Sequence, residues 1–171
     1  TQMLRENINY IDSVLFTHEH RDHVAGIDDL RSFYFLNKKE IPMYMSKRVE
    51  RAIKKNYSYM FGSKQYFGKP KFDIVSVDKK KQFSLFKSKI IPIEVMHHKL
   101  PVLGYRVYDL AYITDANYIE KKEMKKLQNL NILIINCLQK EPHISHFNLE
   151  QVLELIYFLK PKVSYLTHIS H

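Results

Sequence analysis

The sequence contains little of several residue types. Its 171 residues include one cysteine, four glycines and no tryptophan. Because Cys137 is the single thiol, the chain cannot form an internal disulfide, which excludes a disulfide scaffold and favours the reducing cytoplasm. No apolar run approaches the roughly 18 residues of a transmembrane helix, and the first residues lack the apolar segment of a secretory signal. We therefore expect a cytoplasmic protein without a membrane partner.

The composition is that of a globular domain with a basic excess. Hydrophobic residues make up 45% and charged residues 26%, and the formal net charge is +9. This length favours a single domain covering residues 1–171. The charge is compatible with an anionic partner such as nucleic acid. However, 21 of the 27 basic residues are lysines, so a general compositional bias is the simpler interpretation.

Strand patterns and helix patterns alternate along the chain, which indicates a mixed α/β fold. We expect helices over residues 23–36 and after Ser46, which can cap a helix with Val49, Ala52 and Ile53 on its apolar face. Asn117 with Glu120 and Asn148 with Gln151 are further candidate capping pairs. Strands are expected at residues 11–17, 41–45, 72–77, 82–86, 90–96, 105–110, 111–114, 132–135 and 163–166, with those from 72 to 96 forming hairpins and the last two neighbouring and buried.

Residues 56–71 form an irregular stretch rich in aromatic residues and lysine. The simplest interpretation is a loop whose aromatic side chains fill the core. A substrate lid, a homodimer surface and a nucleic-acid contact are the alternatives, because aromatic rings and lysines together can stack bases and meet phosphates.

The nine histidines fall into four clusters, a distribution typical of metal ligands drawn from loops. The densest is the segment Thr17-His18-Glu19-His20-Arg21-Asp22-His23, directly after a predicted strand. In extended backbone His18 and His20 point the same way and can share one metal ion. Asp22 and His23 follow where the next helix begins and can address a second ion. Imidazole favours Zn, Fe, Ni or Cu, and a carboxylate adds Mn.

Two other candidate ligands also follow predicted strands. Asp115 comes after 111–114, and His168 after 163–166 and Thr167. If these strands run in one direction in one sheet, their ends meet at the same edge, where binding sites are usually built. An aspartate after a strand is by itself an ordinary turn residue, so Asp115 gains its significance from the other candidates.

The segment His18-Glu19-His20-Arg21-Asp22-His23 resembles the HxHxDH signature of the metallo-β-lactamase-fold hydrolases. The later motifs of that family follow in order, at residues 97–106, 112–115 and 166–171. Residues 23–31 and 142–148 are most similar to the phosphoribosyl 1,2-cyclic phosphate phosphodiesterases, relatives of the tRNA endonuclease RNase Z. The resemblance implies an α/β fold, an αββα metallo-β-lactamase-like sandwich. Members normally extend further on both sides, so we expect an internal fragment, truncated at both ends.

The resemblance also implies a site for two divalent metal ions, Zn or Mn. His18, His20 and His97 would bind one ion, while Asp22, His23 and His168 would bind the other. Asp115 would bridge the two ions together with a hydroxide. His97 competes with His98 for one ligand position, and its spacing to Gly104 favours His97.

The catalytic candidates implied by the resemblance are His146 and Asp22, the latter also a metal ligand. His146 would face the ions across a substrate-sized gap and protonate the leaving oxygen. The alternative for His143 and His146 is a surface pair before a helix.

We therefore expect a phosphodiesterase that uses the bridging hydroxide on a small, cyclic phosphoester. An RNase Z-like nuclease acting on RNA and a non-catalytic metal-binding scaffold are the alternatives. Arg106, Lys99 and Arg31 are weaker candidates for phosphate contacts.

Overall fold

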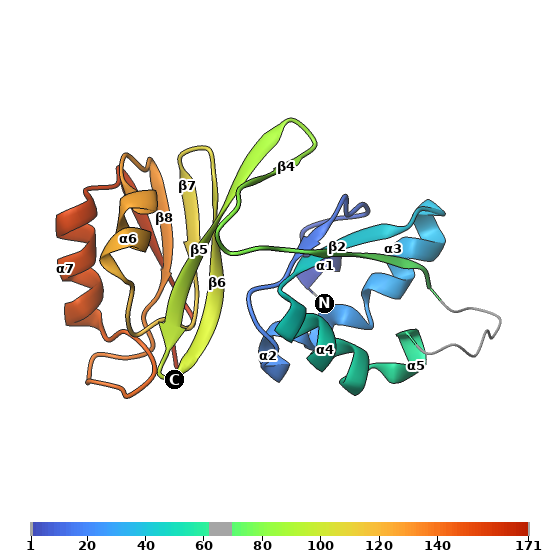
Figure 1. Cartoon of the computed structure of the whole chain (residues 1–171), viewed down its shortest axis with the longest axis horizontal. Coiled ribbons are helices and arrows are strands. Elements are labelled where there is room, and N and C mark those ends of the chain that lie inside the picture. The colour runs from blue at the N-terminus through green and yellow to red at the C-terminus, as the bar shows by residue number, and fades with distance from the viewer. Residues whose placement is uncertain (1, 62–69, 171) are drawn as a thin grey trace. The chain divides into compact units, whose positions relative to one another are not determined.

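The structure, a computed structural model, describes residues 2–61 and 70–170. The chain divides into two compact units, Thr1–Val77 and Asp78–His171, and each contains its own β-sheet (Figure 1). Helices and strands alternate as the sequence indicates, which confirms the α/β class. Within the described ranges, no helix has both the length and the apolar character needed to cross a membrane.

The first unit contains a three-stranded parallel sheet in the order β1-β2-β3, formed by β1 (Val14–Leu15), β2 (Ile41–Met45) and β3 (Phe72–Ser76). Its helical segments are α1 (Gln2–Arg5), α2 (Arg21–Val24), the 3-10 turn η1 (Ala25–Ile27), α3 (Leu30–Asn37), α4 (Lys47–Asn56) and α5 (Ser58–Phe61).

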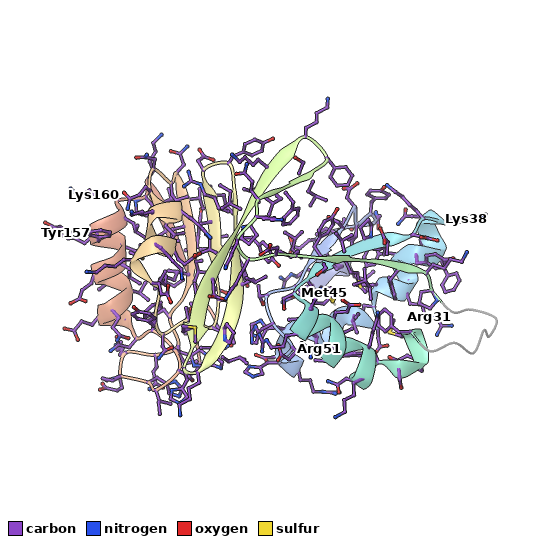
Figure 2. The ribbon with its side chains drawn as sticks, in the orientation of Figure 1. Arg31, Lys38, Met45, Arg51, Tyr157 and Lys160 are labelled. Atoms are coloured by element: carbon purple, nitrogen blue, oxygen red, sulfur yellow. The ribbon has the colours of Figure 1, made fainter. Side chains whose placement is uncertain are left out.

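Strand β2 and helix α4 place apolar side chains in the core of this unit at the spacing that a strand and a helix each require. In β2, Ile41, Met43 and Met45 are buried at alternate positions, as the period of two requires, and Met45 is labelled in Figure 2. In α4, Val49 and Ile53 lie one turn apart and are completely buried, at 0% and 1% exposure. The hydroxyl of Ser46 accepts a hydrogen bond from the Val49 amide, which confirms the predicted cap.

Two predicted elements of the first unit differ from the structure. The expected strand over residues 11–17 is reduced to the two residues of β1. The expected helix over residues 23–36 is broken into α2, η1 and α3. Gly26 and the pair Asp28-Asp29 lie at the break, and glycine and aspartate are weak helix formers. The apolar positions keep their helical spacing across the break, although the backbone there is not one continuous helix.

The second unit contains a six-stranded sheet in the order β4-β5-β6-β7-β8-β9. Its strands are β4 (Phe83–Leu85), β5 (Ser88–His97), β6 (Leu100–Val107), β7 (Leu110–Ile113), β8 (Ile132–Asn136) and β9 (Val163–Thr167). Strands β4 to β7 pair antiparallel, whereas β7, β8 and β9 run parallel. Gly104 in β6 permits close pairing, because a Cβ there would lie 2.8 Å from the Tyr112 carbonyl oxygen.

Helices α6 (Lys121–Met124) and α7 (Leu149–Leu159) and the 3-10 turn η2 (Lys125–Leu127) complete this unit, and both helices lie on the same face of its sheet (Figure 1). Leu127 and Val152 on this layer join Ile113, Leu133 and Ile135 of the sheet in one buried cluster. Asn148 and Gln151 form the predicted capping box at the start of α7.

Two further expectations for these elements are corrected. Strand β3 does not form a hairpin with β4, since β3 pairs with β2 in the first unit's sheet. Asn117 does not cap α6, because its side chain accepts from the His98 amide and donates to the Ile144 carbonyl. Glu120 is the N-terminal cap position of α6, without a side-chain capping bond.

The prediction for residues 132–135 and 163–166 is confirmed for pairing and for the burial of Leu133 and Ile135, and it is wrong for the burial of the second run. The runs form β8 and β9, which are parallel neighbours. However, Val163, Tyr165 and Leu166 are 45%, 56% and 38% exposed. Among the described residues, strand β9 is the last strand of its sheet and pairs with β8 alone. An apolar run does not distinguish such a strand from one covered on both faces.

The irregular stretch over residues 56–71 is described in part. Tyr57 is buried and follows α4, whereas residues 58–61 form α5. Residues 62–69, which include the predicted aromatic core or lid positions Tyr66 and Phe67, lie outside the described residues.

Candidate metal centre

Three strands of the second unit end at the same edge of its sheet. Strand β5 is antiparallel to β6, and β6 to β7, so β5 runs in the direction of β7, β8 and β9. His97 is the last residue of β5, Asp115 follows β7 by two residues, and His168 follows β9 directly. The expected convergence of strand ends is therefore present for these three residues.

Asp115 lies at the centre of this group. The residue is 2% exposed, and its carboxylate has Oδ2 3.4 Å from Nε2 of His146 and Oδ1 3.4 Å from Nδ1 of His168. One ligand atom from each of His97, Asp115 and His146 lies within 4.8 Å of the others. A carboxylate surrounded by imidazoles at this separation can hold a divalent cation.

His97 and His98 occupy different environments, although they are adjacent. The ring of His97 lies 4.5 Å from the ring of His146, and its Nδ1 lies 2.9 Å from the Ser145 carbonyl oxygen. That contact fixes the orientation of the imidazole through Nδ1. Metal-binding histidines are commonly oriented in this way, by a partner at the ring nitrogen that does not bind the metal. His98 is exposed with a positive φ of 55°. The cluster thus contains His97 and not His98.

His146 lies directly against Asp115, with its Nε2 3.4 Å from Oδ2 of the carboxylate, and the predicted substrate-sized gap between His146 and the metal ions stays a prediction. The neighbouring backbone explains this position, because the Phe147 amide donates to the Ala116 carbonyl at 2.7 Å. Its ring also stacks on His168 at 5.1 Å. Burial is the largest effect on the pKa of His146 and lowers it, with the Asp115 carboxylate acting in the opposite direction. Its position suits a metal ligand as well as a proton donor.

The loop that carries Asp115 is held by a residue that sequence reasoning missed. Asn136, the completely buried last residue of β8, accepts from the Ala116 amide at 2.8 Å and donates to the Ala116 carbonyl at 3.0 Å. Thr114 donates to Asp115 Oδ1. Asp115 itself has a left-handed backbone, with φ 52°. The sequence did contain a sign of this role, because Asn136 is a polar residue directly after the apolar run 132–135, just as Asp115 and His168 follow their own predicted strands.

The motif of the first unit gathers its own histidines after β1. The ring of His18 lies 4.6 Å from that of His20 and 4.3 Å from that of His23. His18 is fully buried, and its Nδ1 lies 3.1 Å from the Thr17 hydroxyl. Asp22 Oδ2 lies 3.1 Å from His23 Nε2. The four predicted ligands of this motif therefore come together in one short loop and the first turn of α2.

The weaker phosphate candidates have other roles where the structure shows them. The guanidinium of Arg106 donates to the backbone carbonyls of Tyr108, Lys126 and Gln128 at 2.6–2.7 Å, which makes it a structural clamp. Arg31 lies over the Phe35 ring at 5.7 Å. Lys99 is exposed beside His98.

Comparison with known proteins matches residues 1–169 to the model of the beta-lactamase superfamily domain. One relative, an octanoyltransferase of Porphyromonas gingivalis (strain ATCC BAA-308 / W83), is 34% identical over 171 residues. The match covers 99% of this chain and 34% of that protein. The chain thus spans about a third of the curated relative it matches.

Solved structures share the fold. A new diphosphatase from the PhnP family is 34% identical with a TM-score of 0.90, over 99% of this chain and 64% of that one. The short form of human tRNase Z is 14% identical with a TM-score of 0.73, over 94% and 73%. Zn²⁺-bound PqqB from Methylobacterium extorquens is 14% identical with a TM-score of 0.72, over 93% and 62%. The last two likenesses concern the fold alone.

The histidine and aspartate clusters, the domain match and the shared fold lead to one conclusion: the chain belongs to the beta-lactamase superfamily of hydrolases and has the metallo-β-lactamase fold.

Proposed function

We propose that this protein is a metal-dependent phosphodiesterase that hydrolyses a small phosphoester. The observation that carries the proposal is the group around Asp115, in which a buried carboxylate lies with His97, His146 and His168 at one sheet edge. Such a donor set fits Zn or Mn, because it combines imidazole with carboxylate.

The proposed ligand set has seven members, as the family resemblance implies. His18, His20 and His97 bind one ion, Asp22, His23 and His168 bind a second, and Asp115 binds both. The order of the motifs in the family resemblance supports this division. Two divalent ions supply an activated water at neutral pH and neutralise charge on a phosphoryl group.

His146 acts on the leaving oxygen in this proposal. Its ring is already oriented, since Nδ1 lies 3.0 Å from the Ser145 hydroxyl and Nε2 3.4 Å from Asp115. A positioned imidazole of this kind typically contributes about 10²–10⁴-fold to a rate. His146 is close enough to His97 and Asp115 for the three residues to share one metal ion. Metal content must therefore be measured together with activity.

The choice of a phosphorus substrate is supported by the PhnP-family diphosphatase, which is 34% identical over almost the whole chain. Diphosphatase activity is phosphorus chemistry, and this chain covers 64% of that protein. Octanoyl transfer, the activity named for the Porphyromonas relative, belongs to a protein of which the chain covers 34%. It provides no argument for acyl transfer by these residues.

The test measures bound metal and turnover on the same preparation. Protein loaded with Zn or Mn should contain about two ions per chain and hydrolyse bis(p-nitrophenyl) phosphate, and a chelator should abolish both. Bound metal without turnover of any phosphodiester would favour the non-catalytic scaffold. Cleavage of structured RNA without turnover of small esters would favour a nuclease.

His146→Ala tests the division of roles. It should lower kcat by about 10²–10⁴-fold on an unactivated phosphodiester while metal content stays near the wild-type value. The defect should shrink on p-nitrophenyl esters, because p-nitrophenolate leaves without protonation. Loss of metal from this variant would make His146 a ligand instead, and equal defects on both ester types would refute proton donation.

A further inference from the structure

Ser145 contacts the rings of two of the histidines that lie around Asp115. It belongs to the segment between β8 and α7, one residue before His146. Its carbonyl oxygen lies 2.9 Å from Nδ1 of His97, and its hydroxyl oxygen lies 3.0 Å from Nδ1 of His146. The centroids of the two rings are 4.5 Å apart. One residue therefore contacts the same nitrogen of both rings, through two groups of different chemistry.

The carbonyl contact determines where His97 carries its proton. A carbonyl oxygen only accepts hydrogen bonds, so Nδ1 of His97 has to be the N–H donor. In a neutral imidazole the other nitrogen, Nε2, then has a lone pair instead of a proton. This is the tautomer in which a histidine can bind a metal ion through Nε2.

The surroundings of His146 favour the opposite tautomer. Its Nε2 lies 3.4 Å from Oδ2 of Asp115, and an ionised carboxylate only accepts hydrogen bonds. A lone pair on Nε2 would be repelled by the carboxylate, whereas an N–H there is attracted to it. With the proton on Nε2, Nδ1 becomes an acceptor, and the hydroxyl of Ser145 can donate to it.

His143 also approaches Nδ1 of His146, with its own Nδ1 at 3.2 Å. The backbone amide of Ser145 donates to that Nδ1 of His143 at 3.3 Å, so the atom is an acceptor and supplies no proton to His146. The Ser145 hydroxyl lies closer to His146, at 3.0 Å, than to His143, at 3.3 Å. The reverse arrangement, in which His146 donates from Nδ1 to His143, would place the Nε2 lone pair against Asp115.

We propose that Ser145 is a positioning residue that sets opposite tautomers in His97 and His146. Its carbonyl keeps the proton of His97 on Nδ1, so that Nε2 is available to a metal ion. Its hydroxyl keeps the proton of His146 on Nε2, the nitrogen that would face the leaving oxygen. The roles of the two rings rest on the phosphodiesterase function proposed above, whereas the tautomers themselves do not depend on turnover.

Nitrogen NMR of the metal-free protein with ¹⁵N-labelled histidine measures the tautomers, because protonated and unprotonated ring nitrogens differ widely in chemical shift. At about pH 8, where an ordinary imidazole is neutral, His97 should carry its proton on Nδ1 and His146 on Nε2. His97→Ala and His146→Ala identify the two sets of signals. The same tautomer in both rings would overturn the proposal.

Ser145→Thr and Ser145→Val form a matched pair, because threonine and valine have the same shape and only threonine has a hydroxyl. Ser145→Thr should retain both tautomers. In Ser145→Val, His97 should be unchanged because the carbonyl remains, and His146 should lose its preference for a proton on Nε2. His143→Ala should leave both tautomers as in the wild type. A shift of His146 in His143→Ala as large as in Ser145→Val would overturn the role of the hydroxyl.

Kinetic measurements with the metal-loaded protein test the consequence for catalysis. On an unactivated phosphodiester, Ser145→Val should have a kcat about 10- to 100-fold below that of Ser145→Thr, as is typical when a hydrogen-bond partner that orients a histidine in a metal site is removed. KM and bound metal should be equal in the two variants. On bis(p-nitrophenyl) phosphate their kcat values should also be equal, because p-nitrophenolate leaves without a proton. Equal defects on both ester types, or loss of metal from Ser145→Val, would show a structural role and contradict positioning.

The two measurements separate this proposal from the proposed function. Opposite tautomers that depend on the hydroxyl at position 145, in a protein that hydrolyses no phosphodiester, would support the positioning role and refute the phosphodiesterase function. Hydrolysis of the unactivated ester with equal kcat values for Ser145→Thr and Ser145→Val would refute the positioning role and support the phosphodiesterase function.

Discussion

His97 and His98 differ in one respect that the sequence does not record, which is the direction in which each side chain leaves the backbone. His97 ends β5 and is directed toward His146, whereas His98 begins the turn to β6 with a left-handed backbone. The predicted preference for His97 agrees with this geometry, although its role as a ligand stays a prediction.

Substituting each of these two histidines provides a matched test of the ligand assignment. His97→Ala should lose bound metal and lower phosphodiesterase activity by at least roughly 100-fold, because removing even an outer partner of a metal ligand costs about 10- to 100-fold. His98→Asn should retain both, since asparagine tolerates the φ of 55° found there. Metal content by mass spectrometry and initial rates are the measurements. A larger loss of metal from His98→Asn than from His97→Ala would reverse the assignment.

At the scale of elements, the ends of some strands carry the candidate ligands, and the end of the strand between them holds the ligand loop in place. Asn136 ends β8 between the strands that present Asp115 and His168, and both of its hydrogen bonds go to the backbone of Ala116. The loop that carries Asp115 is therefore tied to the next strand by one side chain.

Asn136→Ala should destabilise the fold and weaken the metal centre together. It leaves the buried N–H of Ala116 without its partner, at a cost of about 1–3 kcal/mol, whereas the Ala116 carbonyl still accepts from the Phe147 amide. Because a domain of 150–250 residues loses about 2–4 °C per kcal/mol, a fall in Tm of at least about 2 °C is expected by calorimetry. Metal affinity should fall as well. Asn131→Ala, at the opposite end of β8, is the control, and a similar loss of metal from both variants would remove the positioning role from Asn136.

The helical segment that follows the histidine motif shows what a periodic pattern of apolar residues does not predict, which is the continuity of the helix. The apolar positions between residues 24 and 34 follow a helical period, and they are mostly buried as that period predicts. The backbone nevertheless breaks at residues 25–29, next to Gly26. Periodicity indicates which side chains face the core, and those side chains can still face the core when a short turn interrupts the helix.

At the scale of the whole molecule, metal binding should couple to stability. Metal that binds the folded chain at 100 times its dissociation constant adds about 2.7 kcal/mol to the free energy of unfolding. For a chain of this size that corresponds to a rise in Tm of roughly 5–10 °C.

A thermal scan with Zn or Mn and with chelator measures this coupling. The rise in Tm should persist in His98→Asn, whereas His168→Ala should lose most of it because a proposed ligand is gone. An equal rise in wild type and His168→Ala would mean that the ions bind elsewhere.

The sequence by itself determined the α/β class, the family and the identity of the residues that gather into clusters. These features depend on local order, since HxHxDH needs only a strand end and a turn to bring its side chains together. The caps at Ser46 and Asn148 were predictable for the same reason. The single-domain prediction remains a prediction, alongside the division into two compact units.

Tertiary structure decided what depends on residues far apart in the chain. The exposure of Tyr165 follows from the place of β9 at the end of its sheet, and the contact of His146 with Asp115 follows from pairing between Phe147 and Ala116. The hydrogen bonds of Asn136 to Ala116 and of His97 to Ser145 likewise arise where separate segments meet. Sequence patterns report the surroundings of one segment, whereas sheet order and packing determine which segments become neighbours.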